Sequence, residues 1–471
     1  MLKSQRQRLH ARIANVLETQ LVTRAEAAPE VVARHFAEAG LADQAVRWWR
    51  KAANAAVSRA AFEEAGAHLD AAQALLSAMD DAPRRQRDEA GVAITRAQVS
   101  LMRNGYAHER TRALYAEADR LAQGADDSRL ILLARYGVWA HHHVGEEVRA
   151  ALDIAAQMLD AANRRQDLDL TVFAHRKLGC SLTMAGRFDE ACDVFENARV
   201  LYDPARHQAL GLGMGTDPLV AINCYQSLAE LARGYPERAA AMANAAQDII
   251  AGVSLVNAKA YTIYHCAVLA VMMRASTDAA NLAIELATVS DTYGMAFWAA
   301  TAKAIEACCM LDGDDARRAP EAIAASIAAL KATGSRLFGA YFLSLLAEAQ
   351  ARNHDTAAIA TSREAEAQAE RSGAFFSLAE IQRRQGLVLN LLRPAAADEA
   401  EAAFQRALAT ARSQNAHLWE LRAATSLAGS WAKRGERQRA HDLLAPIHGW
   451  FTEGFDTLDV TEAGALLETL T

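Results

Sequence analysis

The sequence predicts an all-α protein, built as one right-handed solenoid of about ten helical hairpins with a period of about 40 residues. The first observation is composition: alanine is the commonest residue, while glycine and proline number only 25 and 8 of 471. Such a chain loses little side-chain entropy on forming helices. The second is that aromatic residues make up only 6%, which is typical of neither sandwiches nor barrels. The third is a set of turn marks recurring every 38 to 48 residues.

Each turn mark ends one apolar-periodic segment and begins another. The marks are Gly105, Gly145, Gly186, Gly234, Ala275, Gly313, Asn353, Arg393 and Gly435. In the clearest repeat, the small residues Gly179 and Ala191 allow two antiparallel helices to approach closely, and Phe188 and Phe195 fill the space between them. This is the pattern of a TPR hairpin, lengthened from about 34 residues. The fold class is therefore a TPR-like α-solenoid.

The elements are predicted in chain order as follows. Residues 1–40 form leading linker helices (2–18 and 29–39), residues 41–452 the TPR-like superhelix, and residues 453–471 a C-terminal capping segment with a helix at 460–470. The first hairpin pairs 42–59 with 62–78, and the last pairs 417–434 with 437–451. The glycine-rich stretch 202–216 is the longest connection and predicts a plain inter-repeat loop. Trp450, Phe451 and Phe455 are too apolar for a free tail, and a solenoid end needs covering.

Charge and targeting signals narrow the function classes. The net charge is −7, and no basic patch indicates binding to nucleic acid or to an anionic membrane. The N-terminal residues lack the apolar core of a signal peptide, and the longest apolar run, 260–273, is too short to span a bilayer. The six cysteines form no CxxC pattern, so neither a zinc site nor a disulfide framework is indicated. We expect a cytoplasmic protein.

No catalytic, cofactor or metal site is predicted. No lysine follows a glycine, so the chain has no P-loop, in which lysine must reach the phosphates beyond the glycine loop. The run His141-His142-His143 is the most evident metal candidate. Successive helical side chains point about 100° apart, however, so three adjacent imidazoles cannot converge on one ion. We expect these histidines at a partly exposed helix end, and we expect no enzyme activity.

A binding surface is predicted on the concave face between residues 217 and 384, which the first helix of each hairpin should line. Aromatic rings with polar tips combine contact area with a hydrogen bond. The candidates of this kind, with one arginine, are Tyr225, Tyr264, His265, Tyr341 and Arg383. The alternative for any one of them is that its polar tip only satisfies neighbouring groups of the same chain.

Several strings of the chain resemble a known family. They are residues 420–428 and 443–457 near the end, residues 341–349, and Leu201-Tyr202-Asp203-Pro204 followed by Gly215-Thr216-Asp217-Pro218. Together with the start at 2–14, they resemble the C-terminal TPR (MalT-like) region of bacterial class III adenylate/guanylate cyclase-like proteins that carry a STAND/AAA-type ATPase. The cyclase and ATPase regions of that family would precede Met1, and no position here matches their motifs.

The resemblance implies a non-catalytic regulatory or sensor scaffold. Its partner would be the ATPase/cyclase portion, in the same chain or another, or a small-molecule ligand. Two alternatives stay open: the TPR arm of a STAND-type transcription activator, which would need a helix-turn-helix after the superhelix, and a free-standing ligand-binding TPR protein.

Overall fold

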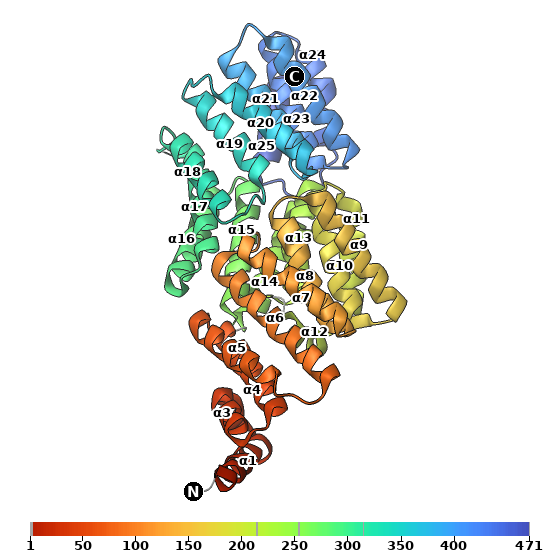
Figure 1. Cartoon of the computed structure of the whole chain (residues 1–471). Helices are drawn as coiled ribbons and strands as arrows, with labels where there is room; N and C mark the ends of the chain where they lie inside the picture. Colours follow the sequence, from red (N-terminus) through yellow and green to blue (C-terminus); the bar gives the residue numbers. More distant parts are fainter. Residues whose placement is uncertain (1–2, 213–214, 253–254, 314, 471) are drawn as a thin grey trace.

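The computed structural model describes residues 3–212, 215–252, 255–313 and 315–470. These residues form α-helices joined by short turns, with one 3₁₀ turn, η1 (Met310–Asp312), and no strand. The all-α prediction is therefore confirmed. The chain winds upward from its N-terminus to its C-terminal helices (Figure 1).

Three helices precede the repeats: α1 (Lys3–Gln20), α2 (Val22–Ala27) and α3 (Pro29–Ala39). The first and third match the predicted leading helices, whereas the short α2 was not expected. Helix α1 packs on α3, and α3 packs on the first helix of the first hairpin.

Ten antiparallel pairs follow in the described part of the chain, and the helices of each pair contact one another. The pairs are α4 (Ala42–Ser58) with α5 (Phe62–Leu76), α6 (Ala82–Asn104) with α7 (Glu109–Gly124), α8 (Ser128–Val144) with α9 (Val148–Arg165), α10 (Leu168–Met184) with α11 (Phe188–Leu201), α13 (Pro218–Ala232) with α14 (Pro236–Ala251), α15 (Val256–Met272) with α16 (Ser276–Tyr293), α17 (Ala296–Cys309) with α18 (Ala319–Ala332), α19 (Gly339–Arg352) with α20 (Ala358–Ser372), α21 (Leu378–Leu392) with α22 (Ala397–Ser413), and α23 (His417–Lys433) with α24 (Arg437–His448). A last helix, α25 (Leu458–Leu470), packs on α23 and α24.

The connection 202–216 differs from the prediction because it contains a helix, α12 (Pro204–Leu212). The Asp203 side chain accepts a hydrogen bond from the Ala205 backbone N–H at 3.0 Å, and Pro204 occupies the first helical position. Both features favour the start of a helix, which continues to Leu212 in spite of Gly211. Gly213 lies outside the described residues.

The hairpins are held close by matched small and large residues. An ideal Cβ added to Gly179 would lie 2.4 Å from the ring of Phe195, and one added to Gly386 would lie 2.5 Å from the ring of Phe404. Neither glycine can therefore become a larger residue without moving its partner ring. The predicted interlock of α10 and α11 is thus present, and α21 and α22 repeat it.

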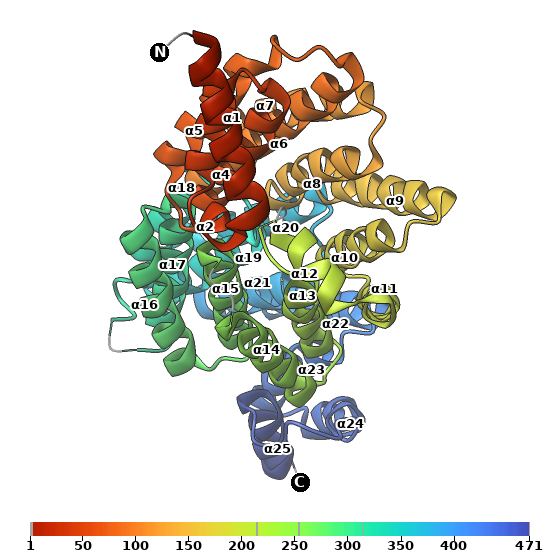
Figure 2. The ribbon, with the colours of Figure 1, turned by 90° about the horizontal axis from the view of Figure 1, so that it is seen from below.

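Successive turns of the superhelix contact one another, which the sequence did not indicate. Backbone hydrogen bonds run from Arg336 N–H to the Val144 carbonyl (2.9 Å) and from Phe376 N–H to the Met184 carbonyl (3.0 Å). Side-chain hydrogen bonds join residues 150 to 226 positions apart. Seen from below, first helices of hairpins such as α13 and α15 lie toward the inside of the molecule, and second helices such as α9, α11 and α16 lie toward the outside (Figure 2). As a result every residue of α13 except Leu219 is buried, and the expected open concave face is largely closed.

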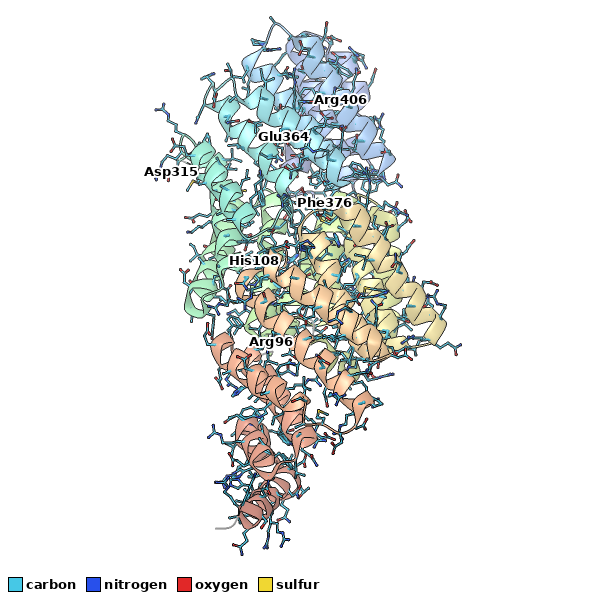
Figure 3. All side chains as sticks on the ribbon, viewed as in Figure 1. Arg96, His108, Asp315, Glu364, Phe376 and Arg406 are labelled. Atoms are coloured by element: carbon cyan, nitrogen blue, oxygen red, sulfur yellow. The ribbon has the colours of Figure 1, made fainter. Side chains whose placement is uncertain are left out.

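One aromatic group shows how the turns meet. Phe376, 1% exposed, lies between the C-terminal repeats and the middle of the molecule (Figure 3). Its ring centroid is 5.8 Å from those of Phe188 and Phe338 and 6.4 Å from that of Trp419. These rings come from four different hairpins, so packing between turns continues the core of each repeat.

The segment after α24 covers the end of the solenoid only in part. Phe451 is buried, and the Trp450 ring stacks on His417 with centroids 3.7 Å apart. Phe455 is 60% exposed, which contradicts the expectation that all three aromatic rings are covered, because Gly454 turns the chain away before α25 begins. None of the described helices combines the length and the apolar character needed to cross a membrane.

Candidate functional site

The five predicted binding residues all lie on first helices, but they fall into two groups. Tyr225 on α13 and Tyr264 and His265 on α15 line one cavity, and Tyr341 on α19 and Arg383 on α21 line another. All except Arg383 are 2% exposed, because the next superhelical turn covers them. Their assignment to a binding surface therefore stays a prediction, and it now concerns two enclosed sites instead of an open groove.

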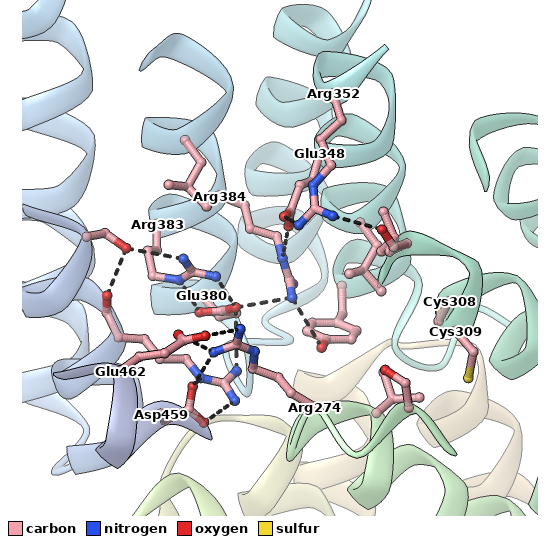
Figure 4. A pocket seen from close by; sticks show the side chains of 18 of the residues that line it. Arg274, Cys308, Cys309, Glu348, Arg352, Glu380, Arg383, Arg384, Asp459 and Glu462 are labelled. Carbon is pink, nitrogen blue, oxygen red and sulfur yellow. Dashed lines mark hydrogen bonds and ion pairs between the residues drawn. The ribbon is translucent and has the colours of Figure 1, made fainter. Parts of the chain in front are cut away.

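We call the second site the arginine pocket. It has a volume of about 220 Å³ and lies where α19, α21, α23 and α25 meet the turn between α15 and α16 (Figure 4). Its charged lining consists of five arginines and four carboxylates: Arg274, Arg352, Arg383, Arg384, Arg422, Glu348, Glu380, Asp459 and Glu462.

Glu380 is the centre of this network. It is 1% exposed and accepts two hydrogen bonds from Arg383, from Nε and Nη2, both at 2.7 Å. Nη2 of Arg384 lies 3.1 Å from its Oε1. Burial alone would raise the pKa of Glu380, but the charges of Arg383 and Arg384 hold that pKa well below its usual range. Glu380 is therefore ionised at neutral pH.

Arg384 links Glu380 to α19. It donates from Nε to Glu348 Oε2 at 3.0 Å, from Nη1 to Ser344 Oγ at 3.1 Å and from Nη2 to the Tyr341 hydroxyl at 3.4 Å. Its guanidinium also lies 4.7 Å from the centre of the Tyr341 ring. Tyr341 is thus a buried support for an arginine, which is the alternative that the sequence analysis left open for such residues.

The C-terminal helix completes the pocket. Arg422 donates to both oxygens of Asp459 (2.9 and 2.7 Å) and to the Met272 carbonyl (2.6 Å). Arg274 donates to both oxygens of Glu462 (2.6 and 2.8 Å). These bonds connect α25 to α23 and to the end of α15, so α25 supplies part of the pocket lining through Asp459 and Glu462.

Three of the pocket arginines are more exposed than a carboxylate with which they pair. The Arg352 and Glu348 side chains are 41% and 11% exposed, those of Arg274 and Asp459 36% and 4%, and those of Arg383 and Glu380 15% and 0%. Only Glu462 among the carboxylates is substantially exposed. A molecule that enters the pocket therefore meets the guanidinium groups of Arg274 and Arg352 together with the Glu462 carboxylate, and arginine groups of this kind bind carboxylates well.

The first group of predicted residues lines what we call the aromatic cavity. Its lining residues are Tyr106, Tyr136, Trp139, Ala140, His143, Val144, Arg176, Tyr225, Tyr261, Tyr264, His265, Phe297, Trp298 and Leu337. His143 Nε2 and the Tyr225 hydroxyl are 2.7 Å apart, and His265 Nδ1 donates to the Tyr261 carbonyl at 2.8 Å. Burial lowers the pKa of His143 to about 3 and that of His265 to about 4, so both rings are neutral at neutral pH.

The histidine run does not behave as one unit. His143 is 3% exposed, which corrects the expectation of a partly exposed helix end, because the neighbouring helices α10 and α13 cover the inner face of α8. His142 faces outward to Glu147, with Nδ1 2.6 Å from Oε2. Among the described residues, no group of three histidine, cysteine, aspartate or glutamate side chains is placed to hold a metal ion.

Sequence reasoning missed most of the arginine pocket. Arg274, Arg422 and Asp459 come from distant segments that the superhelical pitch brings together, and no local pattern marks them. Glu380 and Arg384 did carry a signal: they lie at i and i+4 on the buried side of α21, where an uncompensated charge would be costly.

Fold and site together define the class: a TPR-like helical-repeat protein with charged and aromatic sites on its inner helices. No protein-family model and no curated protein matches the chain. Among solved structures it is similar to the Rap protein complexed with competence and sporulation factor, with a TM-score of 0.48 and 12% identity over 72% of this chain and 96% of that one. It is also similar to yeast Tom70, with a TM-score of 0.32 and 12% identity over 95% and 96% of the two chains.

Proposed function

We propose that this chain is a non-catalytic regulatory scaffold that binds a carboxylate-rich segment of a protein partner in the arginine pocket. The observation that carries the proposal is the order of charges in the pocket: three of the four carboxylates, Glu348, Glu380 and Asp459, are more deeply buried than the arginines paired with them. The four carboxylates fix the positions of the arginines, and the five arginines leave one positive charge in excess. A carboxylate from outside would balance that charge.

The chemistry of the pocket supports binding more than catalysis. Arginine does not lose its proton in proteins, and the low pKa of Glu380 keeps that group ionised. Burial raises the pKa of the Cys308 thiol, so this cysteine is a poor nucleophile. None of these three groups is suited to transfer a proton or attack a substrate at neutral pH.

A regulatory role agrees with the family resemblance, in which a TPR arm controls an ATPase and cyclase portion. We include that portion as the proposed kind of partner. Asp459 and Glu462 of α25 line the arginine pocket. Binding of a partner in this pocket would therefore be coupled to the position of α25.

The test is the binding of a fluorescein-labelled hexaglutamate peptide, measured by anisotropy at 50 and 150 mM salt. Wild-type protein should bind it, and Arg352→Gln and Arg383→Gln should each weaken binding about tenfold, which corresponds to about 1.4 kcal/mol. The matched control is Arg363→Gln, which removes an exposed arginine of α20 outside the pocket. A hexaglutamine peptide controls for contacts that do not depend on charge. Equal binding by the pocket variants and the Arg363 variant would contradict the proposal.

A further inference from the structure

Two adjacent cations on α10 are buried without a counter-charge. Arg176 is 2% exposed and Lys177 is fully buried. Among the residues that the structure describes, neither forms an ion pair, and Arg176 Nε and Nη1 and Lys177 Nζ have no hydrogen-bond partner. The contrast with Arg384 and Arg422 is clear, because each of those buried arginines has two carboxylates beside it. A buried charge without a partner is strongly unfavourable.

Lys177 can be buried without a counter-charge because it can lose its proton. Its Nζ lies 4.3 Å from the centre of the Tyr136 ring and 5.1 Å from that of Trp139, which favours a cation. Burial and the neighbouring Arg176 nevertheless lower the pKa of Lys177 well below its usual range, so it can lose its proton. Arginine cannot do so. The net charge that needs balancing is therefore the single charge of Arg176.

The groups around Arg176 do not supply a negative charge. The titratable neighbours that act on it are Tyr106, Tyr136, Tyr261 and Cys180. Burial raises the pKa of all three tyrosines, and it raises the pKa of Cys180 to about 12. All four groups are neutral at neutral pH, so the counter-charge has to come from outside the chain.

Arg176 lines the aromatic cavity, which has room to receive such a charge. Its free volume is about 30 Å³, about twice what one water molecule requires, so the ligand has to be as small as formate. A tetrahedral phosphate needs more room and would bring more negative charge than Arg176 balances. A planar carboxylate group carries one charge, and it suits a slot between aromatic rings.

We propose that the aromatic cavity is a binding site for a small carboxylate, with Arg176 as its counter-charge. The ligand enters with its carboxylate toward the guanidinium, which donates hydrogen bonds from nitrogen atoms that otherwise have no acceptor. Tyr225, Tyr264 and His265 then form part of the wall instead of a contact surface for a large partner. The aromatic cavity and the arginine pocket share no lining residue. This proposal can therefore be tested independently of the proposed function.

The test uses ¹³C-formate as the probe, followed by NMR line broadening on the full chain at constant ionic strength. Wild-type protein should broaden the formate signal, and unlabelled acetate should reverse the effect, whereas sodium chloride at the same concentration should not. The variant Arg176→Met should bind at least tenfold more weakly. It should also melt at or above the wild-type temperature in carboxylate-free buffer, because it removes the unpaired charge. The matched control, Arg363→Met, should behave as wild type.

Two further arms identify the source of the carboxylate and guard against a misfolded variant. Displacement by acetate alone is expected for so small a cavity and would indicate a free small acid. Displacement by N-acetylglycylglycine as well would indicate the carboxyl end of a peptide whose remaining atoms stay outside the cavity; both outcomes support the site. Ala140→Val keeps Arg176 but narrows the cavity, and it should also abolish broadening while the helical circular dichroism is retained. Absence of broadening with wild type, undiminished binding by both variants, or displacement by chloride as effective as that by acetate would overturn the proposal.

Discussion

Arg422 is the residue whose removal should most disturb the C-terminal end of the solenoid. Its guanidinium is 6% exposed, donates to both oxygens of Asp459 and to the Met272 carbonyl, and lies 3.6 Å from Glu380. The substitution Arg422→Ala leaves Asp459, whose side chain is 4% exposed, with Arg274 as its remaining partner at 3.3 Å.

The magnitude follows from these contacts. Removing one partner of a buried ion pair destabilises a protein by about 3–5 kcal/mol, and the Met272 carbonyl also loses a hydrogen bond worth about 1 kcal/mol. Arg274 partly compensates Asp459, so we expect a total loss of about 3–4 kcal/mol. The double variant with Asp459→Ala should lose less than the sum of the two single variants, because the charges would no longer be left unpaired.

Urea unfolding followed by far-UV circular dichroism measures the total loss. Hydrogen exchange locates it, since a solenoid can unfold from one end. Amide exchange should accelerate in α23, α24 and α25 and stay unchanged in α4 to α7. A loss below about 1 kcal/mol, or faster exchange spread evenly along the chain, would refute the role given to Arg422.

Four other outcomes are expected. Glu146 is buried, and burial raises its pKa to about 8. Since the folded state holds this proton more tightly than the unfolded state does, the free energy of unfolding should fall as pH rises from about 4.5 to about 8. The variant Glu146→Gln should remove this pH dependence in thermal melts across that range. Gly179→Ala should lower stability by about 1–3 kcal/mol because its methyl group meets Phe195. The control Gly66→Ala, with open space around it, should be neutral or stabilising by up to about 1 kcal/mol. Equal effects of the two variants in urea melts would contradict the close packing of Gly179 against Phe195. Truncation after Ile447 should lower the melting temperature and promote aggregation, and an unchanged melting temperature would show that the segment is not a cap. Purified protein should neither hydrolyse ATP nor form cyclic AMP, and turnover that persists through further purification would contradict the non-catalytic assignment.

The helices and their pairing could be predicted because their causes are local. Gly179 and Phe195 are near in sequence and face each other across one hairpin, so the pattern of small and large residues determines both the helices and the turn. Helix α12 was not predicted because the local sequence signals oppose each other. Asp203 and Pro204 favour the start of a helix, whereas the glycines that follow disfavour its continuation.

The contacts between superhelical turns could not be predicted from the sequence. The pitch of a solenoid is the sum of small rotations at each repeat, and it decides that Arg336 meets Val144 and that Arg422 meets Asp459. This is why Tyr341 was expected in an open groove and is buried under the next turn. Arg176 and Lys177 could have been singled out, since two cations side by side in the middle of a predicted first helix need an explanation.

The measurement that tests the central claim most directly is hydrogen exchange of the full chain with and without the hexaglutamate peptide. Binding in the arginine pocket should protect amides in α19, α21 and α25 and in the turn between α15 and α16, and it should leave the outer helices α20 and α22 unchanged. In the Arg352→Gln variant this protection should be smaller at the same peptide concentration. Protection of the outer helices, or the same protection in wild type and in the Arg352 variant, would contradict the claim that this chain recognises carboxylates through the arginine pocket.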